Sequence, residues 1–113
     1  MATYDRFTPV NIRVNYNMNS AESTDAFKNL QTKILDKFSS PGVEIARDSV
    51  DIERIYRPFE VYINGGLVFS KYRFGHYPSA GDINSIIDVA KEVYHGGEPR
   101  SIDSYTVTVG GLD

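Results

Sequence analysis

Apolar and polar residues alternate with a period of two from Pro9 to Tyr16, and this alternation predicts the first strand. Its apolar positions would face a core. Its polar positions, which include Arg13, would face the opposite side. Asn17, Asn19 and Ser20 follow, and these residue types favour a turn and the start of a helix.

The pattern then changes to helical spacing. Ser20 or Ser23 could cap this helix, which should end near Phe38 because proline and glycine occur in residues 39–42. A short strand with Val43 and Ile45 follows, and residues 47–57 show no clear pattern and predict a loop. The apolar stripe of the helix comprises Phe27, Leu30, Ile34, Leu35 and Phe38.

Residues 59–72 have the pattern of a hairpin. Two strands, 59–63 and 67–72, flank Asn64, Gly65 and Gly66, which tolerate a positive φ. A loop over 73–80 leads to a second helix. Ser79 and Asp82 resemble a capping box at its start, and Gly96 with Gly97 would end it. Its apolar stripe comprises Ile83, Ile86, Ile87, Ala90, Val93 and Tyr94.

These elements predict an α+β domain in the order β-α-β-β-β-α. The first β-α-β unit should be a right-handed parallel crossover, and strands with one polar face indicate helices on one side of the sheet only. We expect a flexible leader over 1–8, the domain over 9–97 and a tail over 98–113. The core should comprise Val14, Tyr16, Phe27, Leu30, Ile34, Val61, Ile63, Phe69, Ile86 and Ala90.

Residues 105–109 have strong β-propensity and predict a strand in the tail. This strand could add to an edge of its own sheet or pair across a dimer. Pairing within one chain needs only the short loop 98–104, so we favour a monomer.

The hairpin sequence resembles the selenoprotein W family, also called Rdx. The resemblance rests on the strand 59–63, the Asn64-Gly65 turn and a second strand that reaches Ser70-Lys71. The first strand, which ends in Tyr16, is also similar. The resemblance extends from Val10 to His95 and implies a thioredoxin-like two-layer sandwich with a mixed four-stranded sheet. The spacing before Phe27 differs from that of the family by one residue.

The redox motif of the family is absent from this chain. In the family, Cys-x-x-Cys or Cys-x-x-selenocysteine follows the tyrosine, whereas Asn17 and Ser20 stand at those positions here. The chain has no cysteine at all, so no thiolate is available for disulfide exchange or peroxide reduction. We therefore expect no thiol oxidoreductase activity. Turn formation and helix capping account for both residues, and the alternative is a loop that keeps a ligand-recognition role.

Composition argues against several other classes of function. Fifteen acidic and twelve basic residues give a net charge of -3, which does not favour nucleic acid. The apolar runs are too short to span a membrane, and no secretory signal opens the sequence, so we expect a cytoplasmic protein. His76 and His95 lack a matching acidic cluster, and we expect neither a metal nor a cofactor.

Four further residues are candidates for a role in binding. Pro58 precedes a strand and could face the former redox motif as a cis-proline, or could simply begin the strand in the trans form. Arg13, Tyr62 and Tyr72 should project from the polar side of the sheet. Tyrosine and arginine often anchor interfaces, so this face is a candidate interaction surface.

Two hypotheses for the function follow. The first is a redox-inactive binding or regulatory module with an unidentified protein partner. The second is a thiol-independent enzyme or a small-ligand carrier that uses the former active-site cleft. A polar pocket with Arg47, Asp48 or His76 beside Ser20 would favour the second, and an extended tyrosine-bearing face would favour the first.

Overall fold

The computed structural model describes residues 8–17, 19–38, 43–49 and 58–102. It contains both strands and helices, which confirms the predicted α+β class. In chain order the elements are β1 (Val10–Tyr16), α1 (Ala21–Lys37), β2 (Val43–Ser49), β3 (Phe59–Ile63), β4 (Gly66–Ser70), α2 (Lys71–Phe74) and α3 (Ala80–Tyr94).

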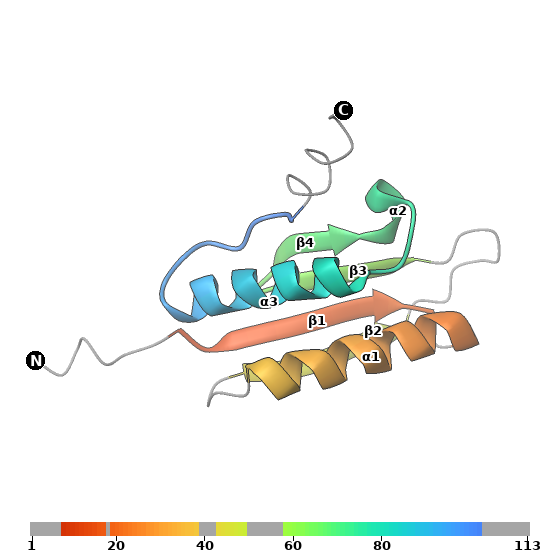
Figure 1. Ribbon diagram of the computed structural model, residues 1–113, viewed down its shortest axis with the longest axis horizontal. Helices are drawn as coiled ribbons and strands as arrows, with labels where there is room; N and C mark the ends of the chain where they lie inside the picture. The colour runs from red at the N-terminus through yellow and green to blue at the C-terminus, as the bar shows by residue number, and fades with distance from the viewer. Residues whose placement is uncertain (1–7, 18, 39–42, 50–57, 103–113) are drawn as a thin grey trace, which may run out of the picture.

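The strands form one sheet in the order β2-β1-β3-β4. β1 pairs in parallel with β2, as predicted for the β-α-β unit. β3 pairs antiparallel with both β1 and β4. Figure 1 shows α1 and α3 side by side in front of the sheet. They cover the same face. Among the described residues no helix lies on the opposite face of the sheet, the helix-free face.

The core lies between these two helices and the sheet, and it contains all ten residues predicted for it. The predicted apolar stripe of the first helix was wrong at one position. Leu35 is 44% exposed, whereas Ile34 beside it is fully buried. Successive residues in an α-helix are about 100° apart, so Leu35 lies outside the stripe that meets the sheet.

The hairpin turn forms at Asn64 and Gly65, two of the three predicted residues, and Gly66 is already the first residue of β4. Asn64 has φ 48° and Gly65 has φ 86°, the left-handed conformations that a tight hairpin turn requires. The side chain of Asn64 also links the turn to the first strand: its Oδ1 accepts a hydrogen bond from the amide of Asn11 at 2.7 Å, and its Nδ2 donates to the carbonyl of Pro9 at 3.1 Å. The turn is therefore attached to the neighbouring strand as well as to its own.

The region after β4 differs from the prediction. The strand expected over 67–72 ends at Ser70, and residues 71–74 form the short helix α2 instead. Gly75 ends this helix with φ 84°, a left-handed conformation. Tyr72 consequently lies on α2 and not on the sheet. The loop predicted over 47–57 was also wrong at its start, because β2 continues to Ser49.

Both long helices begin and end where the sequence predicts. Ser20 caps α1, Phe38 follows its last turn, and Ser79 forms a complete capping box with Asp82 at the start of α3. The amide of Thr8 donates to the carbonyl of Tyr94, so the end of the predicted leader contacts α3. Residues 1–7 and the predicted strand 105–109 lie outside the described residues. Within the described part of the chain, no helix is long and apolar enough to cross a membrane.

Candidate functional site

Asn17 and Ser20, which the sequence resemblance predicts to stand at the redox-motif positions, lie between β1 and α1. The side chain of Asn17 accepts a hydrogen bond from the amide of Asn19 at 2.8 Å, and its carbonyl accepts one from the amide of Ser20 at 3.0 Å. The hydroxyl of Ser20 accepts from the amide of Ser23 at 3.2 Å. The turn and capping roles predicted for these residues are both observed.

Pro58 lies at the same end of the sheet. In the antiparallel pair of β1 and β3, Tyr16 is opposite Phe59. Asn17 follows Tyr16 and Pro58 precedes Phe59, so both lie at this end. Pro58 is buried. The peptide bond before it involves Arg57, which lies outside the described residues, so whether this proline is cis stays a prediction.

Tyr77 is a residue of this end that sequence reasoning missed. Its phenol oxygen lies 2.7 Å from the hydroxyl oxygen of Ser23, which is fully buried in the first turn of α1. Its ring packs edge-on against Phe59 at 5.5 Å, and the ammonium of Lys71 lies 5.0 Å from the ring centroid. The only signal in the sequence was an aromatic residue next to a proline, which does not indicate a partner.

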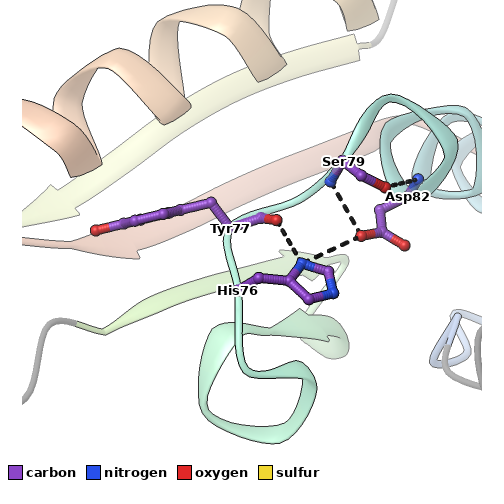
Figure 2. Close-up of polar contacts among 4 residues, drawn as sticks. All are labelled: His76, Tyr77, Ser79 and Asp82. Atoms are coloured by element: carbon purple, nitrogen blue, oxygen red, sulfur yellow. Dashed lines mark hydrogen bonds and ion pairs between the residues drawn. The ribbon is translucent and has the colours of Figure 1, made fainter.

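His76 lies in a polar cluster at the start of α3 (Figure 2). Its Nδ1 lies 2.6 Å from the carbonyl oxygen of Tyr77 and 3.8 Å from a carboxylate oxygen of Asp82. The same carboxylate accepts the amide of Ser79, and the hydroxyl of Ser79 accepts the amide of Asp82. These contacts attach His76 to the cap of α3, and none of them brings it beside Ser20. Arg47 and Asp48 belong to β2, but their side chains are not among those that the structure describes.

The face of the sheet opposite the helices has a second group of polar side chains. Arg13 and Tyr62 are opposite each other on β1 and β3, as predicted for the polar side of these strands. Arg13 is exposed and Tyr62 is half-buried. Both line an open depression of about 370 Å³, together with Asn11, Asn15 and Gly65.

No protein-family model matches this chain, and no curated protein matches it either. The comparisons therefore assign no ligand or activity to the depression, and its chemistry has to be derived from its own side chains.

Asn15 is the residue of this face that the sequence did not single out. Its side-chain oxygen is buried and has no hydrogen-bond partner among the described residues. Asn15 is opposite Glu60. One carboxylate oxygen of Glu60 accepts a hydrogen bond from the hydroxyl of Tyr62 at 3.2 Å, and the other accepts one from the hydroxyl of Ser70 at 3.4 Å. Because buried polar atoms are normally paired, the Asn15 oxygen is a candidate acceptor for a donor outside the described residues.

Tyr72, the third residue predicted for this surface, is elsewhere. It lies on α2 and is 76% exposed. The alternation of strand β4 does not reach it, because the backbone turns into a helix after Ser70. The described residues also contain no cluster of three or more histidine, aspartate or glutamate side chains that could hold a metal ion.

Proposed function

We propose that this chain is a thioredoxin-like domain of the selenoprotein W type that has no redox motif and acts as a protein-binding module. Three features support the likeness: the hairpin sequence, the order of the first elements, and a turn that leads from Tyr16 directly into the capped helix α1. At the two redox positions this chain has an amide and a hydroxyl, and both form local hydrogen bonds. Binding at this end would therefore have to proceed without thiol exchange.

The observation that carries the proposal is the helix-free face of the sheet. Its depression is lined by an exposed arginine, a half-buried tyrosine and an asparagine whose buried oxygen has no described partner. Tyrosine and arginine are enriched in protein interfaces because each combines a large contact area with hydrogen-bonding groups. The depression is open, which suits an extended segment of another protein.

The chemistry of this face also indicates what a partner would present. Asn15 offers an acceptor to a backbone or side-chain N–H of the partner, and the guanidinium of Arg13 offers donors to carbonyl or carboxylate oxygens. A polypeptide segment supplies both kinds of group along its backbone. We therefore favour a protein segment as the occupant of this face.

An affinity enrichment from native extract, quantified by mass spectrometry, tests this proposal. The bait is the full chain, compared with a double variant, Arg13→Ala with Tyr62→Ala. A matched control variant changes two exposed residues on the helical side, Lys28→Ala with Leu35→Ala. Thermal unfolding of all three baits checks that each is folded.

The proposal predicts a set of proteins that the wild type and the helical-side variant enrich and that the Arg13/Tyr62 variant loses. Each protein in this set should then bind the purified wild-type chain directly in calorimetry. The same set on all three baits, or no saturable binding to the purified chain, would contradict the proposal.

A further inference from the structure

A row of polar residues crosses three strands on the helix-free face of the sheet. Asn15 of β1 is opposite Glu60 of β3, and Glu60 is opposite Ser70 of β4. We call Asn15, Glu60 and Ser70 the polar row. Because opposite residues of paired strands lie close together, the row borders the depression, which Asn15 and Tyr62 help to line.

Two hydroxyl groups hold the carboxylate of Glu60 in place. The hydroxyl of Tyr62 donates to one of its oxygens and the hydroxyl of Ser70 donates to the other. Ser70 is buried and Glu60 is half-buried, so this carboxylate is only partly hydrated. An ionised carboxylate has about four acceptor positions, and these hydrogen bonds occupy two of them. The remaining positions can accept donors from a bound molecule.

A cationic donor suits this position better than a neutral one. Both donors described for Glu60 are neutral hydroxyls, and the ion pairs found among the described residues do not include it. Hydrogen bonds from a cation to a carboxylate are roughly twice as strong as those between neutral groups. The oxygen of Asn15 is a further acceptor, and the soft χ2 torsion of asparagine lets the amide turn toward a bound donor.

The register of the sheet adds acidic positions to this face. Glu44 and Asp48 of β2 are each opposite an asparagine of β1. With Glu60 they make three acidic positions, against the single basic position of Arg13, among the register positions of β1, β2 and β3 that belong to this face. The whole chain has a net charge of -3. An acidic surface on an acidic protein attracts cationic segments and repels anionic ones.

We infer that the polar row receives a lysine or arginine side chain of the protein segment that binds the helix-free face. This inference rests on the proposed function, because it specifies the chemistry of the partner that this function requires. Glu60 accepts the charged N–H groups of that side chain, and Asn15 accepts a further one. Arginine fits best, because its planar guanidinium carries several donors in a fixed geometry.

Fluorescence anisotropy with a labelled decapeptide of alternating arginine and threonine tests the inference at low ionic strength, about 50 mM, where screening is weak. The same peptide with citrulline in place of arginine is the uncharged control of similar shape. The variant is Glu60→Gln, and Glu22→Gln is its matched control, because it makes the same change at an exposed position on α1. Asn15→Lys is a second variant that places a cation inside the row. Amide chemical shifts locate the peptide, and thermal unfolding checks that each variant is folded.

We expect the arginine peptide to bind about tenfold more tightly than the citrulline peptide, with shift changes centred on Asn15 and Glu60. Glu60→Gln should weaken its binding about tenfold, and Asn15→Lys should weaken it at least as much, because the new ammonium competes for the carboxylate. Glu22→Gln should change binding less than about twofold. Equal losses in Glu60→Gln and Glu22→Gln would overturn the inference, and so would no binding of the arginine peptide.

Two results would overturn this inference and leave the proposed function intact. The first is equal binding of both peptides with shifts centred on Arg13 and Tyr62, because the face would then bind a polypeptide without using its cation. The second is a set of native partners that Glu60→Gln enriches as well as the wild type does and that the Arg13/Tyr62 double variant loses. The same shifts with calcium chloride alone would assign the polar row to a metal ion instead.

Discussion

The hydroxyl oxygen of Ser23 lies 2.7 Å from the phenol oxygen of Tyr77, and this contact joins α1 to the loop before α3. Ser23 is fully buried, so its hydroxyl has little access to water. Tyr77 in turn packs against Phe59 of β3. One hydrogen bond therefore connects α1 with the loop that leads into α3.

Replacing Tyr77 by phenylalanine should lower the free energy of unfolding by about 1–3 kcal/mol, because the buried Ser23 hydroxyl loses its partner. Ser23→Ala should cost less, since the half-buried phenol can bond to water. The double variant should be more stable than the sum of the two losses predicts. Urea denaturation of the four proteins measures this difference, and strictly additive losses would show that the two groups do not interact.

The two leucines of α1 should respond very differently to truncation. Leu30 is 1% exposed, so Leu30→Ala should cost about 2–5 kcal/mol of unfolding free energy through lost burial and an unfilled cavity. Leu35 is 44% exposed, and Leu35→Ala should cost less than about 1 kcal/mol. Chemical denaturation measures both. A loss below about 1 kcal/mol for Leu30→Ala would mean that α1 does not bury this face.

Positions 17 and 20, the redox-motif positions of the proposed family likeness, should accept a disulfide. The hydrogen bond from the amide of Ser20 to the carbonyl of Asn17 closes a four-residue turn. Turns of this kind hold their end Cα atoms within about 7 Å, which is close to the span of a disulfide. The variant with Asn17→Cys and Ser20→Cys should therefore oxidise to an intramolecular disulfide under mild conditions.

Thiol titration and intact mass measure that oxidation, and insulin reduction compares the turnover of variant and wild type. The wild type should reduce insulin no faster than buffer alone, because it contains no thiol nucleophile. A folded double variant that stayed reduced would contradict the assignment of these two positions.

The ion pair between Glu92 and Arg100 should be visible in the pH dependence. Hydrogen bonds from the Arg100 guanidinium, at 3.0 and 2.9 Å, lower the pKa of Glu92 from its usual 4.5, and the positive charge of Arg100 adds to this effect. Because the folded pKa is lowered, the pair stabilises the fold above the unfolded pKa. This contribution is lost as the pH falls below about 4.5.

In Arg100→Gln, the pKa of Glu92 should rise toward its usual value, whereas Lys91→Gln, a change at the preceding exposed residue, should leave it nearly unchanged. Side-chain carboxyl NMR titration measures both. At neutral pH, Arg100→Gln should lower the free energy of unfolding by less than about 1 kcal/mol, because the pair is exposed to solvent. An unchanged Glu92 pKa in Arg100→Gln would show that the pair does not form in solution.

Much of the fold follows directly from local sequence patterns. Strand alternation before Tyr16, the Asn64-Gly65 turn and the Ser79 cap are short-range signals, because each depends on backbone conformation within a few residues. The same patterns correctly placed the ten core residues. They failed at Leu35, which fits helical spacing only loosely, and at Tyr72. There, Gly75 is the signal that ends a helical turn, whereas the hydroxyl of Ser70 donates to Glu60 and does not cap the helix.

The candidate site was less predictable because it depends on contacts between distant segments. Arg13 and Tyr62 could be assigned to the polar side of their strands, but their pairing required the register of β1 and β3. The contact of Ser23 with Tyr77 joins residues 54 positions apart, and no local pattern indicates it. The Asn15 oxygen, which has no partner in the described part of the chain, likewise becomes apparent only once the neighbouring strands are in place.

Site-specific photo-crosslinking tests the central claim, that the helix-free face of the sheet binds a protein partner. Leu67 is opposite Tyr62 in the pairing of β3 and β4, and Leu35 is exposed on α1 on the other side of the molecule. A benzophenone amino acid is placed at either position, and the chain is irradiated in native extract. The account predicts a discrete protein adduct from position 67 that Arg13→Ala abolishes, and no such adduct from position 35. Adducts of equal yield from both positions, or from position 35 alone, would contradict it.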